Sequence, residues 1–144
     1  MNVEHTVVLP CAIEHAFELF TNHASEWWPA NRRHTGDPAS TIRMEPLGRF
    51  WERATDGREA ELGLVRTWEA PRRIVLEFYI GTGSERPTEA TIHFEPEGEG
   101  TRVTVTHRPL AASEAIWAEF APRFVSSWEV VFEALARFER TPGR

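Results

Sequence analysis

The spacing of hydrophobic residues changes twice along the chain. The first part has a β-branched segment and then helical spacing, the middle alternates with a period of two, and the end returns to helical spacing. Residues 3–10 (VEHTVVLP) are rich in β-branched side chains, and residues 12–20 (AIEHAFELF) repeat apolar side chains at helical spacing. This pattern predicts a strand followed by a helix. A second short helix or turn is expected in 23–29 (HASEWWP), and residues 30–40 have the composition of a loop.

The middle of the chain alternates polar and apolar residues with a period of two, as half-buried strands do. The alternating segments are 41–45, 48–53, 63–68, 73–80, 88–95 and 101–107. Turn sequences separate them, among them Pro46-Leu47-Gly48 and Asp56-Gly57. The pattern predicts six antiparallel strands in a meander.

The C-terminal segment returns to helical spacing. Apolar residues stand at i, i+4, i+7, i+11 and i+14, namely Phe124, Trp128, Val131, Leu135 and Phe138. This predicts one long helix with an apolar face. Because proline is tolerated mainly in the first turn of a helix, Pro122 predicts a break or kink before Phe124.

Strand, two short helices, six strands and one long helix together predict an α+β domain that spans residues 1–144. The helices would lie on one face of a curved antiparallel sheet of about seven strands. A curved sheet with one helix across its mouth leaves a space that either side chains or a ligand fills.

Charge and composition exclude several classes of function. The formal net charge is −6, and all 16 basic residues are arginines that are spread among 22 acids. Nucleic acid is therefore a poor partner, and no lysine is available for Schiff-base or phosphate-loop chemistry. The six histidines are scattered and there is one cysteine, so neither a metal site nor a cofactor is expected.

The cellular location is expected to be the cytoplasm. The start of the chain (MNVEHTVVLP) lacks the features of a secretion signal, and no apolar run approaches the roughly 20 residues that span a bilayer. Membrane insertion is not expected, and both a monomer and a homodimer remain open.

Aromatic side chains are predicted to converge where the early helices meet the long one. The candidate ligand-binding residues are Trp28, Phe50, Glu52, Phe78, His107, Trp117, Phe124 and Trp128. Trp28 belongs to the sequence EWWP at 26–29, which would supply an aromatic wall or lid for the space between sheet and helix. The alternative is that these rings simply fill the core.

Two polar residues share the parity of apolar neighbours in their strands and are the candidate catalytic residues. Glu52 alternates with Phe50, and His107 alternates with Val105. If both face a dry pocket, they orient a ligand or act as general base and acid. The alternative is that they hydrogen-bond to each other or to the backbone and do no chemistry.

Several phrases, in this order, resemble the helix-grip domains of the START and SRPBCC superfamily. They are EWWP (26–29), EPLGRFWER (45–53), DG (56–57), GLVRTWEAPRRIVLEF (63–78), FEPEGEGTRVTVTHR (94–108) and Trp128 in the last helix. The branch they resemble is the C-terminal domain of activators of the heat-shock-protein-90 ATPase, over residues 3–138. Leu47-Gly48 replaces the paired glycine of the family, which predicts a tighter or less strained turn.

The resemblance implies a helix-grip fold with a pocket for apolar or aromatic small molecules between the sheet and the long helix. Our leading hypothesis is a non-enzymatic or weakly catalytic domain that binds a lipid-like or polyketide-like molecule. One alternative is a co-chaperone-like partner that stimulates a heat-shock ATPase. Another is a polyketide cyclase or hydrolase that uses Glu52 and His107. The fold itself does not select among these.

Overall fold

The computed structural model describes residues 2–140, in which seven antiparallel strands form one sheet in the order β1-β7-β6-β5-β4-β3-β2. The strands are β1 (Val3–Leu9), β2 (Thr41–Met44), β3 (Arg49–Arg53), β4 (Glu59–Glu69), β5 (Arg73–Phe78), β6 (Thr88–Glu97) and β7 (Gly100–Pro109). The helices are α1 (Ile13–Asn22), α2 (Ala24–Trp27) and α3 (Trp117–Arg140), with short 3-10 helices η1 (Ala30–Arg32) and η2 (Ala111–Ile116). The predicted α+β helix-grip fold is confirmed.

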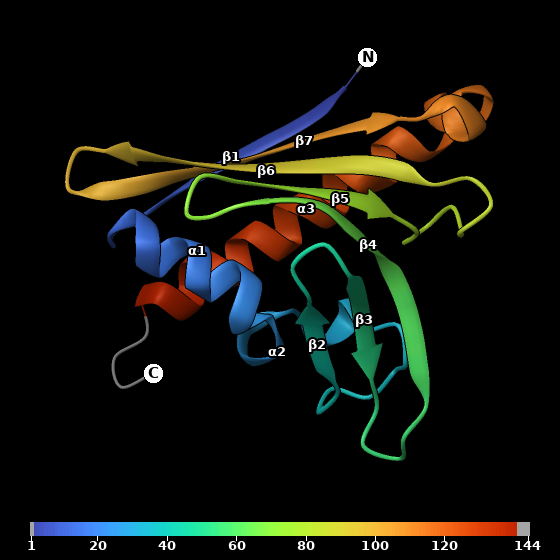
Figure 1. The fold of residues 1–144 in the computed structure, drawn as a ribbon, viewed down its shortest axis with the longest axis horizontal. Helices are drawn as coiled ribbons and strands as arrows, with labels where there is room; N and C mark the ends of the chain where they lie inside the picture. The colour runs from blue at the N-terminus through green and yellow to red at the C-terminus, as the bar shows by residue number, and fades with distance from the viewer. Residues whose placement is uncertain (1, 141–144) are drawn as a thin grey trace.

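The sheet curls around the long helix α3 (Figure 1). Strands β1, β7, β6 and β5 lie across α3, whereas β4 bends away and carries β3 and β2 towards α2. Helix α3 contacts β1 and β7, α1 contacts β6 and β7, and α2 contacts both β2 and α3. All three helices therefore pack on one side of the curved sheet, and the core lies between the two layers.

The alternation of the strands correctly predicted which side chains face the core. In β7, Val103, Val105 and His107 are fully buried, whereas Arg102 and Thr104 are partly exposed. Strand β3 likewise buries Phe50 and Glu52, as their shared parity predicted. A one-residue slip would have exchanged the two faces, so the buried glutamate confirms the register.

Helix α3 is continuous from Trp117 to Arg140, so the break predicted before Phe124 is absent, while the alternative, a kink, stays a prediction. Pro122 lies inside the helix, where its missing N–H costs the hydrogen bond to the carbonyl of Ala118. Burial of Phe124, Trp128 and the rest of the apolar face offsets that loss. In residues 2–140 no helix is both long enough and apolar enough to cross a membrane.

The turn between β2 and β3 departs from its prediction. Leu47 has a φ of 57°, in the left-handed region that favours glycine, and its side chain is 71% exposed. The expected relief of strain at Leu47-Gly48 is therefore wrong. A leucine holds here the left-handed conformation that a glycine would adopt more easily.

Candidate functional site

An aromatic cavity of about 210 Å³ lies between α3, the end of β5 and the loop that follows α2. We refer to it as the cavity. Its lining residues are Trp28, Arg32, His34, Phe78, Ile80, Gly81, Phe120, Arg123, Phe124, Ser127, Trp128 and Val131. Aromatic and aliphatic side chains form most of the surface, and the few polar groups come from the loop and from one face of α3. This composition is typical of small-molecule sites.

Trp28 forms one wall of the cavity and is held by the backbone around it. Its backbone N–H donates to the carbonyl of Ala24 (2.9 Å), which ends α2, and its indole N–H donates to the carbonyl of Arg32 (3.3 Å). The Arg33 guanidinium donates to the carbonyl of Trp28 (2.9 Å from Nη2). The same guanidinium donates to the carbonyls of Ser25 (2.8 Å) and Ser40 (2.7 Å). Arg33 thus ties the EWWP segment to the loop beyond it.

Phe78, Phe124 and Trp128 form the back of the cavity. Phe78 lies 5.6 Å from Trp128 and 6.2 Å from Phe124, measured between ring centroids. Gly81, at φ 91°, follows β5, and a Cβ there would approach the Phe124 ring to 3.3 Å. The chain therefore needs glycine at this point to pass close to the ring.

His107 is buried directly behind these rings and bridges the sheet to α3. Trp128 donates its indole N–H to Nδ1 of His107 (2.9 Å), and Nε2 lies 2.7 Å from the hydroxyl of Thr88. Because indole is only a donor, Nδ1 carries no proton, and Nε2–H donates to Thr88. Burial lowers the pKa of His107 from 6.5 to about 3. The imidazole is therefore neutral at physiological pH and acts as a fixed link.

Glu52 holds the loop that carries one wall of the cavity. Its carboxylate accepts hydrogen bonds from the backbone N–H of His34 (2.8 Å) and of Thr35 (2.9 Å), and from the Thr35 hydroxyl (2.5 Å). Burial raises the pKa of the Glu52 carboxyl, but hydrogen bonds from Thr35, His34 and Ser40 outweigh that effect and leave the pKa below its ordinary value. The carboxylate is therefore ionised and already satisfied.

The predicted site residues divide into two groups. Four of them line the cavity, namely Trp28, Phe78, Phe124 and Trp128. The other four, Phe50, Glu52, His107 and Trp117, lie outside the lining. Phe50 packs between Trp28 (6.4 Å) and Phe78 (6.2 Å), and Trp117 stacks on Phe124 (5.6 Å). The inward orientation of Glu52 and His107 is confirmed, but their hydrogen bonds go to different partners, and their catalytic role stays a prediction.

Eight lining residues were not among the predicted site residues: Arg32, His34, Ile80, Gly81, Phe120, Arg123, Ser127 and Val131. The first two lie in or beside η1, where no periodicity reveals which side chains face inward. Their only signal is an arginine pair that stands two residues after EWWP. Desolvation lowers the pKa of His34, an effect that the nearby Glu52 carboxylate partly offsets.

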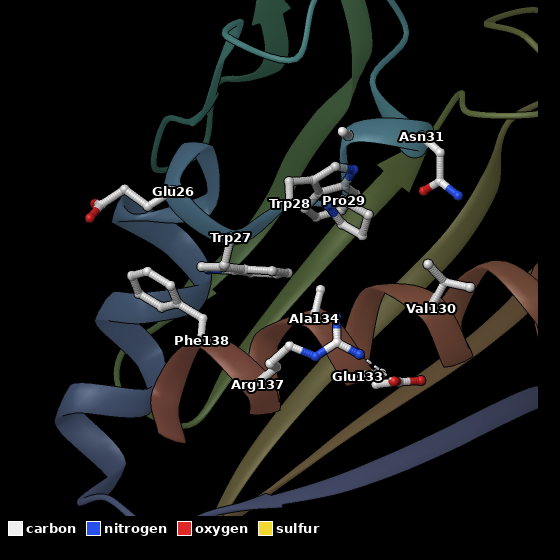
Figure 2. A pocket seen from close by; sticks show the side chains of 11 residues that line it. Glu26, Trp27, Trp28, Pro29, Asn31, Val130, Glu133, Ala134, Arg137 and Phe138 are labelled. Carbon is white, nitrogen blue, oxygen red and sulfur yellow. Dashed lines mark hydrogen bonds and ion pairs between the residues drawn. The ribbon is translucent and has the colours of Figure 1, made fainter. Parts of the chain in front are cut away.

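A second hollow, which we call the groove, also has Trp28 in its lining (Figure 2). Its volume is about 540 Å³, and it runs between the EWWP segment and the last turns of α3. Trp27 faces Phe138 across it, and Glu133 and Arg137 form an ion pair at 2.6 Å along α3. Trp28 is the residue that lines both hollows.

Three potential metal ligands from opposite ends of the chain lie close together in space. The ligand atoms of Cys11, His15 and Glu139 all lie within 4.8 Å of one another. His15 and the buried Glu139 already form an ion pair at 3.3 Å, which accounts for their proximity. The expectation that the protein has no metal site stays a prediction.

Solved structures with the same fold include three with informative descriptions. DynU16, described as a protein of the dynemicin biosynthetic locus, has a TM-score of 0.71 and 16% identity over 97% of this chain, which spans 47% of DynU16. CalU16 from Micromonospora echinospora has a TM-score of 0.65 and 14% identity, covering 96% of this chain and 76% of CalU16. Txn09, an anthrahydroquino-gamma-pyrone synthase, has a TM-score of 0.59 and 25% identity, covering 96% and 94%.

A search of curated proteins found no match. A sequence profile of the family described as Activator of Hsp90 ATPase homolog 1-like protein matches residues 10–139. That match covers most of the chain and agrees with the resemblance seen in its motifs. The chain therefore belongs to the Activator of Hsp90 ATPase homolog 1-like family, on an SRPBCC-type helix-grip fold.

Proposed function

We propose that the protein binds an aromatic or apolar small molecule in the cavity between the sheet and α3. The observation that carries this proposal is the cavity itself, about 210 Å³ lined mainly by Trp28, Phe78, Phe124 and Trp128. A dry cavity of about 150 Å³ holds one benzene ring, whereas drug-sized ligands occupy roughly 300 to 1,000 Å³. The cavity suits one ring, and a larger ligand would extend past its rim.

The descriptions of two relatives of the fold support an aromatic ligand. Txn09 is described as an anthrahydroquino-gamma-pyrone synthase complexed with a ligand designated SUM, and DynU16 belongs to the dynemicin biosynthetic locus. Both descriptions point to small molecules rather than to proteins. For this chain they support the class of ligand and leave its identity to experiment.

The proposal is tested by filling the cavity from α3. Ser127 lines the cavity, whereas its neighbour Ser126 is exposed and lies outside the lining. A phenylalanine at position 127 should occupy the space, while one at 126 should point to solvent. We expect Ser127→Phe to weaken binding of two probes, 2-naphthamide and 2-naphthoate, at least about tenfold by isothermal titration calorimetry, with Ser126→Phe unchanged.

Two results would contradict the proposal. One is the absence of saturable binding of either probe to the unmodified protein. The other is equal binding by the two serine variants, which would place the probes elsewhere on the molecule. The melting temperature of each variant shows whether it is still folded, and a bound probe should raise the melting temperature of the unmodified protein.

The other two candidate functions stay predictions. Catalysis by Glu52 and His107 is not favoured by the geometry, because both side chains are held by hydrogen bonds behind the wall and neither lines the cavity. A contact with a heat-shock chaperone rests on the description of the family alone. The cavity is the feature that most directly supports a function.

A further inference from the structure

The polar residues of the cavity carry one sign of charge. Arg32 and Arg123 line it together with His34 and Ser127, and no aspartate or glutamate belongs to the lining within residues 2–140. The whole protein has a formal net charge of −6, so a site with two cations and no acid runs against the average of the chain. Such a local field attracts an anion.

Arg32 has an unmet hydrogen bond at this site. Its Nε is buried and has no hydrogen-bond partner, while Nη1 donates to the carbonyl of Asn31 at 3.3 Å. No acid in the described part of the chain forms an ion pair with Arg32, in contrast to Arg66 and Arg108, which pair with Glu77 and Glu89. A buried N–H of a cation without an acceptor costs free energy, and an anion beside the guanidinium would lower that cost by charge attraction.

Arg123 stands on α3 and reaches the cavity from the other side. Its guanidinium carbon lies 4.8 Å from the centroid of the Phe120 ring, and both side chains line the cavity. Stacking on an aromatic face holds the guanidinium flat without using its N–H donors. Arg123 also forms no ion pair with an acid among residues 2–140, so these donors face no internal carboxylate.

We propose that the ligand of the cavity is an aromatic anion, whose rings contact Phe78, Phe124 and Trp128 while its carboxylate or phenolate oxygen accepts hydrogen bonds from Arg32 and Arg123. This inference rests on the proposed function, and it adds the charge of the ligand and the residues that recognise it. Guanidinium is suited to this role because its planar fork matches a carboxylate. The aromatic walls supply area, and the arginines supply selectivity.

The test compares two probes of nearly the same shape, 2-naphthoate and neutral 2-naphthamide. We expect the unmodified protein to bind naphthoate at least about tenfold more tightly, because a hydrogen bond to a charged group contributes more than a neutral one. The difference should shrink between about 0.05 M and 0.5 M salt, since part of the attraction at the rim is screened. Isothermal titration calorimetry gives both dissociation constants.

Two substitutions assign the selectivity to residues. Arg32→Gln and Arg123→Gln should each weaken naphthoate binding several-fold, and the double variant at least about tenfold, while naphthamide binding stays within about twofold. Arg53→Gln is the matched control, because Arg53 is an exposed arginine of β3 outside the cavity lining. Both target arginines reach solvent, so the variants are expected to fold, and their melting temperatures verify this.

The possible outcomes distinguish failure of this inference from failure of the proposed function on which it rests. Equal affinity for the two probes, unchanged by the arginine substitutions, would overturn the anionic ligand and leave the aromatic site in place. Failure of both probes to bind would overturn the proposed function and this inference together. Loss of naphthoate binding in Arg53→Gln as well would also overturn it, because the effect would then come from overall charge.

Discussion

The cavity and the groove share a wall, Trp28, and a helix, α3, yet they differ in chemistry. The groove is the larger, at about 540 Å³ against about 210 Å³. Its charges on α3 are paired within the protein, since Glu133 and Arg137 bind each other. The cavity has aromatic walls, and its two arginines form no ion pair with a described acid. Unpaired polar groups therefore distinguish the two hollows better than volume does.

The difference reflects which groups lie behind each wall. Behind the cavity a buried chain of hydrogen bonds runs from Trp128 through His107 to Thr88 and fixes the helix on the sheet. The groove is lined by side chains at the end of α3 that are mostly in contact with water. A ligand meets a rigid wall in the cavity and a solvated surface in the groove, and rigid walls lose less entropy on binding.

The largest expected effect concerns His107 behind the cavity. Its pKa falls from 6.5 to about 3 on folding, so the unfolded chain binds a proton between these values and the folded chain does not. The contribution of neutral His107 to the free energy of unfolding is therefore fully present above pH 6.5 and is lost as the pH falls towards 3. We expect a loss of about 1.4 kcal/mol per pH unit, up to roughly 4 to 5 kcal/mol, in urea titrations at successive pH values.

A variant without the imidazole at position 107 separates the effect of His107 on acid stability from the effect of protonating carboxylates. In His107→Gln the slope between pH 6.5 and 5 should largely disappear, although the variant is less stable at neutral pH. His23→Gln is the control, since His23 is exposed on the surface. An unchanged slope in the His107 variant would mean that the buried imidazole does not control acid stability.

The next effect is a loss of stability at the wall that both hollows share. Arg33→Ala removes the hydrogen bonds to the carbonyls of Trp28, Ser25 and Ser40. We expect a loss of about 2 to 3 kcal/mol in the free energy of unfolding, because hydrogen bonds to charged groups are strong and these carbonyls are partly buried. Naphthoate affinity should fall as well, since Trp28 is no longer held.

Arg33→Lys sharpens this prediction. A lysine keeps the charge but cannot reach three carbonyls with one planar fork, so it should restore less than half of the loss. Chemical denaturation measures both variants, with Arg53→Ala as a surface control. Full rescue by lysine would show that charge, and not the forked geometry, holds the segment.

The smallest effect is expected in the groove. Glu133→Gln breaks the exposed ion pair with Arg137, which as an i, i+4 pair on a helix contributes about 0.3 to 0.5 kcal/mol. The melting temperature should hardly change, and naphthoate affinity should stay within about twofold. A larger loss of affinity would contradict the assignment of the ligand to the cavity, because it would place the ligand in the groove.

Much of the fold could be predicted from local patterns. Alternation with period two identified the strands and placed Val105, His107 and Glu52 inside, because successive side chains of a strand point to opposite faces. Helical spacing identified the buried face of α3, although Pro122 led to a break that is absent. The cost of that proline is local, whereas the packing that offsets it comes from the whole sheet.

Which side chains are inward and aromatic could be predicted from the sequence, because that information lies in the spacing of neighbours along one element. Packing between elements, in contrast, leaves Phe50 and Trp117 outside the lining while Trp28 and Phe124 form the wall of a cavity. It also brings Arg32 and Arg123, 91 positions apart in sequence number, into the lining of the same cavity. Loop conformation and long-range packing determine which residues line the cavity, and neither produces a periodic pattern in the sequence.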